Sequence, residues 1–318
     1  MTLEQILYNE SLMKRFCRDY SVPVSTLKYP YIERQLNTLS LHDSSYLNRF
    51  NDFIREVADY KNEEEYFAYY NGIKESIINY ICNHPQYKSF IEKSFRKNSF
   101  EKKELYSETN HKKVFVSIDL RKANFTIMKL HCPEMFGDKS WEQTVESFGG
   151  SHYLQNSKYI RQVIFGACNP KKQIQAQTEL MCDLANYLVE HGVKIYSVAT
   201  DEILVEDTEF FDIYNMVSNY TGVPHDMSNI LKIERFVLIH TDLGYVKNIL
   251  GSTVSDDVGK YVFKCVDSDL CCQFVKYFYG APIEEHDLLF DYKGSIAKFV
   301  KPIDNPWRNY KEDLNIII

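Results

Sequence analysis

The 318-residue chain has few of the residues that interrupt secondary structure, with only 12 Gly and 9 Pro. A composition so poor in both is unlike that of a linker-rich or disordered protein. Hydrophobic residues make up 44% of the chain and include 24 Tyr and 20 Phe, which is enough for a sizeable core. We therefore expect one large domain or two to three closely packed subdomains.

Long apolar runs and paired cysteines are missing too. No stretch approaches the ~18 apolar residues that a membrane-spanning helix needs, and the N-terminal MTLEQILYNESLMKRF breaks its apolar residues with charges, unlike a secretion signal. The eight Cys form no CxxC pair, which argues against a zinc site or a disulfide framework. These features predict a soluble, cytoplasmic protein with no membrane partner.

The motifs of several enzyme classes are absent. The chain has no G-x-x-x-x-G-K-[ST] loop, no G-x-G-x-x-G and no G-x-S-x-G, which argues against P-loop, dinucleotide and serine-hydrolase chemistry. Its nine His show no H-E-x-x-H or H-x-E pattern, so zinc hydrolysis is not indicated. The net charge of −7 counts mildly against a nucleic-acid binder, although it is compatible with a local basic track.

Residues 1–110 are predicted to form a helical N-terminal region. Apolar residues recur there at helical spacing, as in Phe50, Phe53 and Val57 of one segment and in the isoleucines of GIKESIINYICNH. The segment 87–113 holds eight Lys or Arg against four Glu, interleaved with Phe and Tyr. It is interpreted either as a solvated helix face followed by a loop or as an electrostatic track for phosphates.

Strands and helices mix from residue 111 onward. VFVSIDL at 114–120 predicts a strand, and KIYSVATDEILVE at 194–206 predicts another or a hairpin. Helices are predicted at 153–165, at 169–192 and around 270–279, and two strands are predicted at 230–250. The second of these helices is expected to have its apolar residues facing one way, and these are Ile174, Leu180, Leu184 and Leu188.

This order favours an α+β fold rather than a doubly wound sheet. We expect an antiparallel sheet with packed helices at 111–250, preceded by the helical region and followed by a mixed C-terminal region at 251–318.

Two adjacent carboxylates, Asp201 and Glu202, lie within an apolar, β-branched stretch. Neighbouring residues of a strand point to opposite faces, so both can approach one point only at a hairpin tip. Asp119 ends the apolar strand at 114–120, and it would meet them if the two segments are neighbours in one sheet. Buried carboxylates need a cation, which is either a lysine or a metal ion. Three carboxylates contributed by two strands would suit a pair of Mg²⁺ or Mn²⁺ ions that assist phosphoryl transfer.

These segments resemble the motifs of right-hand, palm-domain nucleic-acid polymerases. VFVSIDLRKANFTIMKL is similar to the first palm motif, in a form close to that of reverse transcriptases, and YSVATDEILVE is similar to the third. SKYIRQVIFG resembles the nucleotide-binding helix of DNA polymerases, and ILKIERF followed by GYVK resembles the K-x-E segment of replicative ones. The resemblance covers about 112–250. It departs from reverse transcriptases in two places. The acidic pair is Asp-Glu preceded by Ala199–Thr200, and the segment at the position of the second palm motif, FGACNPKKQIQAQ, lacks the usual Gln-Gly and Ser.

The resemblance implies a palm-type sheet with small fingers and a C-terminal thumb. It implies that Asp119 and Asp201 bridge the metal ions, that the Leu120 carbonyl is a further ligand, and that Glu202 is an auxiliary ligand or supports the ligands from behind. Asn124 would lie where such enzymes sense the sugar 2′ position.

Lys158 and Arg161 share a helix face and could hold the triphosphate, although a surface role is an alternative. Lys232 and Lys247 flank the hairpin expected at 230–250, with either a phosphate-neutralising or a structural role.

The function expected is metal-dependent addition of nucleotides to a nucleic-acid 3′ end, with a primer or template and nucleoside triphosphates as partners. A chain this compact suits a virus, a mobile element or a specialised repair or priming task. Two alternatives stay open: a palm-fold protein that binds nucleic acid without catalysis, and a metal-dependent nuclease that uses the same acids.

Overall fold

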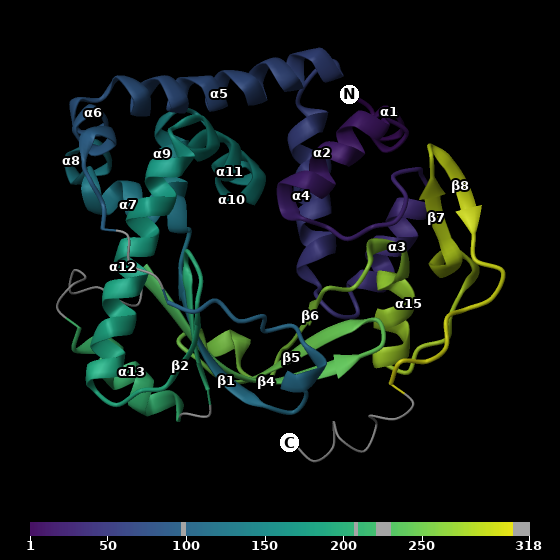
Figure 1. The fold of residues 1–318 in the computed structure, drawn as a ribbon. Coiled ribbons are helices and arrows are strands. Elements are labelled where there is room, and N and C mark those ends of the chain that lie inside the picture. The colour runs from purple at the N-terminus through teal and green to yellow at the C-terminus, as the bar shows by residue number, and fades with distance from the viewer. Residues whose placement is uncertain (97–99, 207–208, 221–229, 308–318) are drawn as a thin grey trace.

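The computed structural model describes residues 1–96, 100–206, 209–220 and 230–307. Residues 97–99 of the basic segment and residues 308–318 of the predicted C-terminal region lie outside the described residues. The fold is α+β, as predicted (Figure 1). A long helix lies across one end of the molecule, and the main sheet lies at the opposite end with helices on either side. No helix in the described ranges is long and apolar enough to cross a membrane.

The N-terminal region is helical, as predicted, and its helices are α1 Leu3–Leu7, α2 Glu10–Tyr20, α3 Tyr31–Leu39, α4 Ser45–Ala58, α5 Glu63–Asn83 and α6 Pro85–Glu92. The long α5 begins at the N-cap Asn62, whose side chain accepts a hydrogen bond from the Glu65 amide. Three glutamates in its first turn stabilise the helix by interacting with the positive end of the helix dipole. In α4, Phe50, Phe53 and Val57 are buried, as the helical spacing predicts.

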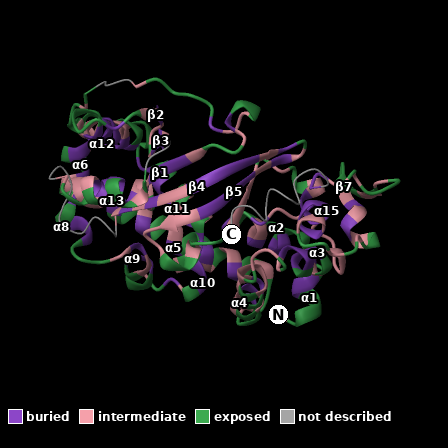
Figure 2. Ribbon diagram, turned by 90° about the horizontal axis from the view of Figure 1, so that it is seen from below, coloured by how far each residue is buried: buried purple, intermediate pink, exposed green. Residues whose placement is uncertain are grey.

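The main sheet has six antiparallel strands in the order β2-β3-β1-β4-β5-β6. Their bounds are β1 Val114–Leu120, β2 Ile195–Val198, β3 Glu202–Glu206, β4 Leu231–Thr241, β5 Gly244–Ser252 and β6 Tyr261–Lys264. β1 is an inner strand with apolar packing on both faces: Val116 and Ile118 belong to the large helical core, and Phe115 packs with Phe236 on the other face. Buried and intermediate residues accordingly run along β1, β4 and β5 (Figure 2).

The helices that follow β1 are α7 Ala123–His131, α8 Pro133–Phe136, α9 Trp141–Ser147, α10 His152–Asn156, α11 Lys158–Ala167, α12 Pro170–Glu190 and α13 Phe210–Ser218. The single helix predicted at 153–165 is wrong, because Ser157 has an extended backbone and caps α11 by accepting a hydrogen bond from the Ile160 amide. The helix predicted at 169–192 is confirmed as α12. Of the apolar residues predicted to face one way, Leu184 and Leu188 are buried, whereas Ile174 is 49% exposed and does not share their environment.

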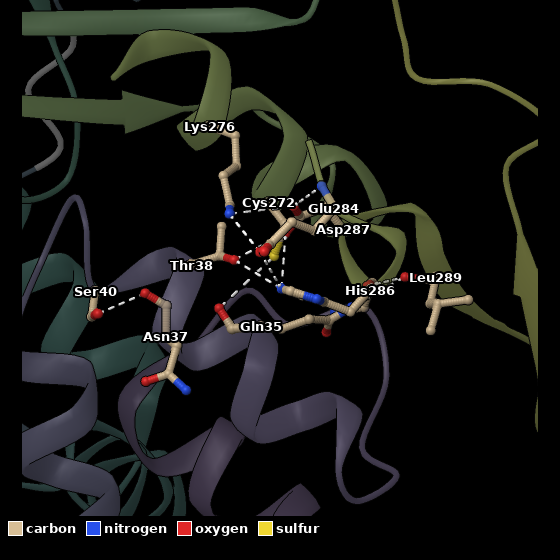
Figure 3. A network of polar contacts seen from close by, with 11 residues as sticks. Gln35, Asn37, Thr38, Ser40, Cys272, Lys276, Glu284, His286, Asp287 and Leu289 are labelled. Carbon is tan, nitrogen blue, oxygen red and sulfur yellow. Dashed lines mark hydrogen bonds and ion pairs between the residues drawn. The ribbon is translucent and has the colours of Figure 1, made fainter. Parts of the chain in front are cut away.

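The C-terminal region packs against the N-terminal helices. It contains α15 Ser268–Phe278, the 3-10 helices η2 Ser255–Asp257 and η3 Glu285–Leu288, and a hairpin of β7 Leu289–Tyr292 and β8 Ser295–Lys298. The Thr38 hydroxyl donates to Asp287 at 2.9 Å, and the Ser25 hydroxyl donates to the Leu289 carbonyl at 2.7 Å. The segment expected to act as a thumb is therefore held to the N-terminal region by buried polar contacts (Figure 3).

Candidate active site

Asp119 lies at the end of β1 between two charged neighbours. In the antiparallel register it is directly opposite Glu202 in β3 and Lys232 in β4. Directly opposite residues of antiparallel strands project from the same face of the sheet. The fold therefore places Asp119, Glu202 and Lys232 on one face, although Asp119 and Glu202 are 83 positions apart in the chain.

The acidic pair occupies a hairpin tip, as predicted. The Ala199 amide donates to the Glu202 carbonyl at 2.8 Å, which closes the turn between β2 and β3. The Leu120 amide donates to the Asp201 carbonyl at 2.8 Å, which ties this turn to the end of β1. These hydrogen bonds fix the backbone at Asp201. Its side chain is exposed, so the carboxylate remains accessible.

Clustered negative charge alters the acidity of Asp119. Burial, followed by the charges of Glu202 and Asp201, raises the pKa of Asp119 to about 7, and Lys232 only partly opposes this. Lys232 is itself paired with Glu234 at 2.6 Å and with Asp257 at 2.8 Å, so its charge is shared with these acids. A bound cation would relieve this accumulation of charge and favour the ionised carboxylate.

Glu202 has a partner inside the sheet that the sequence did not indicate. Its Oε1 accepts a hydrogen bond from the Ser117 hydroxyl at 2.6 Å and lies 3.9 Å from the Lys247 ammonium. Lys247 is buried in β5, with its ammonium 4.2 Å from the centre of the Phe236 ring. Burial lowers the pKa of Lys247, and the charge of Glu202 opposes this. At least one oxygen of Glu202 is therefore engaged by protein groups.

The three predicted acids are close in the fold but do not form a tight ligand cluster. Within the described ranges, one set of three His, Cys, Asp or Glu side chains has its ligand atoms within 4.8 Å of one another, and this set is Glu284, His286 and Asp287. A metal ion bound by Asp119, Asp201 and Glu202 together would therefore require side-chain movement. The exposed Asp201 carboxylate is free of packing that would prevent such movement.

The cluster in η3 was missed because sequence motifs for metal sites use other spacings. Figure 3 shows its side chains turned toward one another beside Lys276 from α15. The Lys276 ammonium is 2.9 Å from Glu284 Oε2 and 3.7 Å from Asp287 Oδ2. A metal ion could bind there only by displacing this lysine, so the cluster is already charge-balanced by the protein.

The predicted nucleotide-contacting residues are distributed over two helices. The Asn124 side-chain oxygen, in α7, accepts a hydrogen bond from the Gln177 amide at 2.7 Å and so links α7 to α12. Lys158 is the exposed first residue of α11. Arg161 is half-buried, and burial lowers its pKa against the opposing charge of Glu142. Sequence reasoning overlooked Arg121 and Lys122, although they directly follow β1 and line a cavity beside α7.

Several basic residues near the predicted nucleic-acid track are engaged in ion pairs. Arg96 contacts Glu179 at 2.8 Å and Asp183 at 2.5 Å, and Lys103 is 3.3 Å from Glu101. These contacts favour the solvated-surface interpretation of the described part of the segment 87–113 over the phosphate track.

Comparison of the chain with protein-family models, with curated protein sequences and with solved structures finds no match. We therefore base the function on the residues of the site and on their arrangement.

Proposed function

We propose that this protein is a metal-dependent nucleotidyltransferase that adds nucleotides to a nucleic-acid 3′ end. The observation that carries the proposal is the pairing of Asp119 with Glu202 beside the turn that presents Asp201. The antiparallel order β2-β3-β1 brings the first and third polymerase-like motifs together, as a palm site requires. Mg²⁺, or Mn²⁺, would supply stabilisation of the charge that develops on the transferred phosphoryl group.

Asp119 and Asp201 are suited to hold the metal ions. Both offer the carboxylate oxygens that hard cations prefer. Burial, followed by the charges of Glu202 and Asp201, raises the pKa of Asp119, and a bound cation would offset both effects. Glu202 supports the site from within the sheet, because Ser117 and Lys247 engage its Oε1. Its negative charge adds to that of Asp119 and Asp201, which favours the binding of a cation beside Asp119.

One observation favours the non-catalytic alternative. The engagement of Glu202 by Ser117 and Lys247 removes part of one potential metal ligand, and the described acids of the site are not drawn within 4.8 Å of one another. A protein that kept the arrangement only as a scaffold would bind nucleic acid without extending it.

Extension of a labelled primer tests the proposal. The primer is supplied on a DNA template, on an RNA template and alone, with Mg²⁺ or Mn²⁺ and all nucleoside triphosphates. We expect metal-dependent extension that Asp119→Asn and Asp201→Asn each lower at least about a hundredfold. Asp242→Asn, at an exposed position in the β4–β5 turn, removes the same charge and should leave extension unchanged.

Other outcomes would separate the alternatives. Primer shortening in the same reactions, lost in the two site variants, would assign a nuclease. Binding of the primer without extension or shortening, unaffected by Asp201→Asn, would mean that the acids are structural.

A further inference from the structure

A cavity of about 780 Å³ adjoins the end of β1. Its walls come from the β1–α7 connection, from one side of α7 and from the segment that leads into α9. Phe125, Leu130 and Trp141 contribute apolar and aromatic side chains to the lining, whereas Arg121, Lys122 and Lys129 contribute three positive charges against the one negative charge of Asp138. The volume is typical of pockets that enclose a small organic ligand, and this combination of surfaces suits an anion that carries an apolar ring.

The three cations of the cavity differ in how they are satisfied. Lys122 forms an ion pair with Glu142, and the Lys129 ammonium donates to the Lys139 carbonyl at 2.8 Å. Arg121 has neither a hydrogen bond from its guanidinium nor an ion pair within the described ranges, and its Nε atom is buried without a partner. A buried donor left unpaired costs about 1–3 kcal/mol, more when it is charged, so a ligand that supplies an acceptor would be favoured there.

A second unpaired donor lines the same cavity. The indole Nε1 of Trp141 is buried and has no hydrogen-bond partner in the described part of the chain. Orphan donors on two different elements, one from the β1–α7 connection and one from α9, thus lie around one space. The argument for a ligand therefore does not depend on a single side chain.

We propose that this cavity binds a nucleotide, with Arg121 as the main contact to its phosphates and the apolar side formed by Phe125 and Leu130 as the surface for its base. The identification of the ligand as a substrate rests on the proposed function, because Arg121 lies only two residues after Asp119. A guanidinium suits this task because its planar donors match phosphate oxygens in pairs and its face stacks on rings.

The helix pair predicted for the triphosphate is less suited to it. Lys158 is exposed at the start of α11, and the charge of Arg161 is opposed by Glu142, which also pairs with Lys122. Among the three cations of the cavity, Arg121 has no hydrogen bond or ion pair from its guanidinium in the described ranges, whereas Lys122 and Lys129 each have a partner. A phosphate contact in the connection after β1 is therefore favoured over one in α11.

Fluorescence of Trp141 tests the proposal directly. Trp307, the other tryptophan, packs in a separate C-terminal cluster, so Trp307→Phe leaves Trp141 as the reporter. ATP, adenosine and tripolyphosphate are titrated with EDTA present, so that metal-mediated binding at the carboxylates is excluded. We expect a saturable change with ATP, and weaker binding of adenosine and of tripolyphosphate because each retains only one half of the ligand.

Substitutions then identify the phosphate contact. Arg121→Gln should weaken ATP binding at least about tenfold, and Arg121→Lys should give an intermediate loss. Arg55→Gln removes an exposed arginine that pairs with Asp52 and should have no effect. Lys158→Gln should also have none. Unchanged ATP affinity in Arg121→Gln, or a loss confined to Lys158→Gln, would overturn the proposal.

Calorimetric titration of the unsubstituted chain and of Arg121→Gln with ATP gives a second readout, should Trp307→Phe disturb folding. Asp119→Asn separates this inference from the proposed function. ATP binding that depends on Arg121 in a chain without extension activity would support the pocket and refute the transferase. Extension activity that is insensitive to Arg121→Gln would support the transferase and refute the nucleotide pocket.

Discussion

Asp119 and Glu202 lie directly opposite each other in β1 and β3 and project from the same face of the sheet. Each lies beside a different lysine, since Asp119 is opposite Lys232 and Glu202 is 3.9 Å from the Lys247 ammonium. Two adjacent acids and two lysines thus share this face. Burial, followed by the charges of Glu202 and Asp201, raises the pKa of Asp119, and Lys232 only partly opposes this.

The first prediction concerns the pH dependence of stability without divalent cations. The pKa of Asp119 is raised from 3.8 to about 7 in the folded protein, so between these values the folded state binds more protons than the unfolded state. The free energy of unfolding should therefore fall as the pH rises from about 4 to about 7, by on the order of 3 kcal/mol from this group. Urea unfolding of the chain and of Asp119→Asn, compared across this range, measures the difference.

The variant should lack this part of the pH dependence, and Asp242→Asn should retain it. Addition of Mg²⁺ at pH 8 should raise the stability of the parent chain more than that of Asp119→Asn. Identical pH profiles for the parent and Asp119→Asn would show that Asp119 has an ordinary pKa.

The second prediction concerns the buried Lys247. Lys247→Met keeps much of the apolar stem but leaves the Glu202 Oε1 with Ser117 as its remaining contact among the described residues. We expect a loss of about 1–3 kcal/mol in the free energy of unfolding, since the lysine is buried and the glutamate only partly so. Glu202→Gln combined with Lys247→Met should recover part of this loss. A double-mutant cycle by urea unfolding measures the coupling, and strictly additive effects would exclude a direct interaction.

The third prediction concerns Asp19 in the helical region. Its carboxylate accepts hydrogen bonds from the hydroxyls of Tyr70 at 2.9 Å, Tyr153 at 2.8 Å and Ser157 at 2.9 Å. Tyr153→Phe should cost about 1–2 kcal/mol and Asp19→Ala about 3 kcal/mol or more, because three buried hydroxyls would lose their acceptor. Thermal unfolding of both variants tests this ranking. Tyr8→Phe, at an exposed tyrosine, should be neutral.

The fourth prediction concerns the cluster of Glu284, His286 and Asp287. Lys276→Met removes the ammonium beside the buried Asp287 and should lower the free energy of unfolding by about 3 kcal/mol. The variant then offers one nitrogen and two oxygen ligands to Zn²⁺, which should restore part of the melting temperature.

The parent chain should not respond to Zn²⁺ in this way, because Lys276 already fills the role of the cation. Lys276→Met combined with His286→Gln should lose the Zn²⁺ response while remaining destabilised. A zinc response of equal size in the parent would instead indicate a metal site that coexists with the lysine.

Local patterns explain which parts of the fold were predictable. The β-branched residues around Asp201 and Glu202 predict two strand arms with a turn between them, and β2 and β3 have this arrangement. Helix periodicity and the Asn169–Pro170 start predict α12 almost to its ends, since the signals are contained in the segment itself. Ser157 escaped notice because its capping role depends on a backbone conformation that neighbouring periodicity masks.

The sequence by itself determined the α+β class, the helical N-terminal region and the strand-end position of Asp119, because these depend on residues within a few turns or one hairpin. Tertiary structure alone decided that β1 lies between β3 and β4, that Glu202 contacts Ser117 and Lys247, and that Ile174 is exposed. It also brought Trp141 to a cavity with Arg121. These relationships join segments that are far apart in the chain, and they follow from strand register and helix packing rather than from local sequence preference.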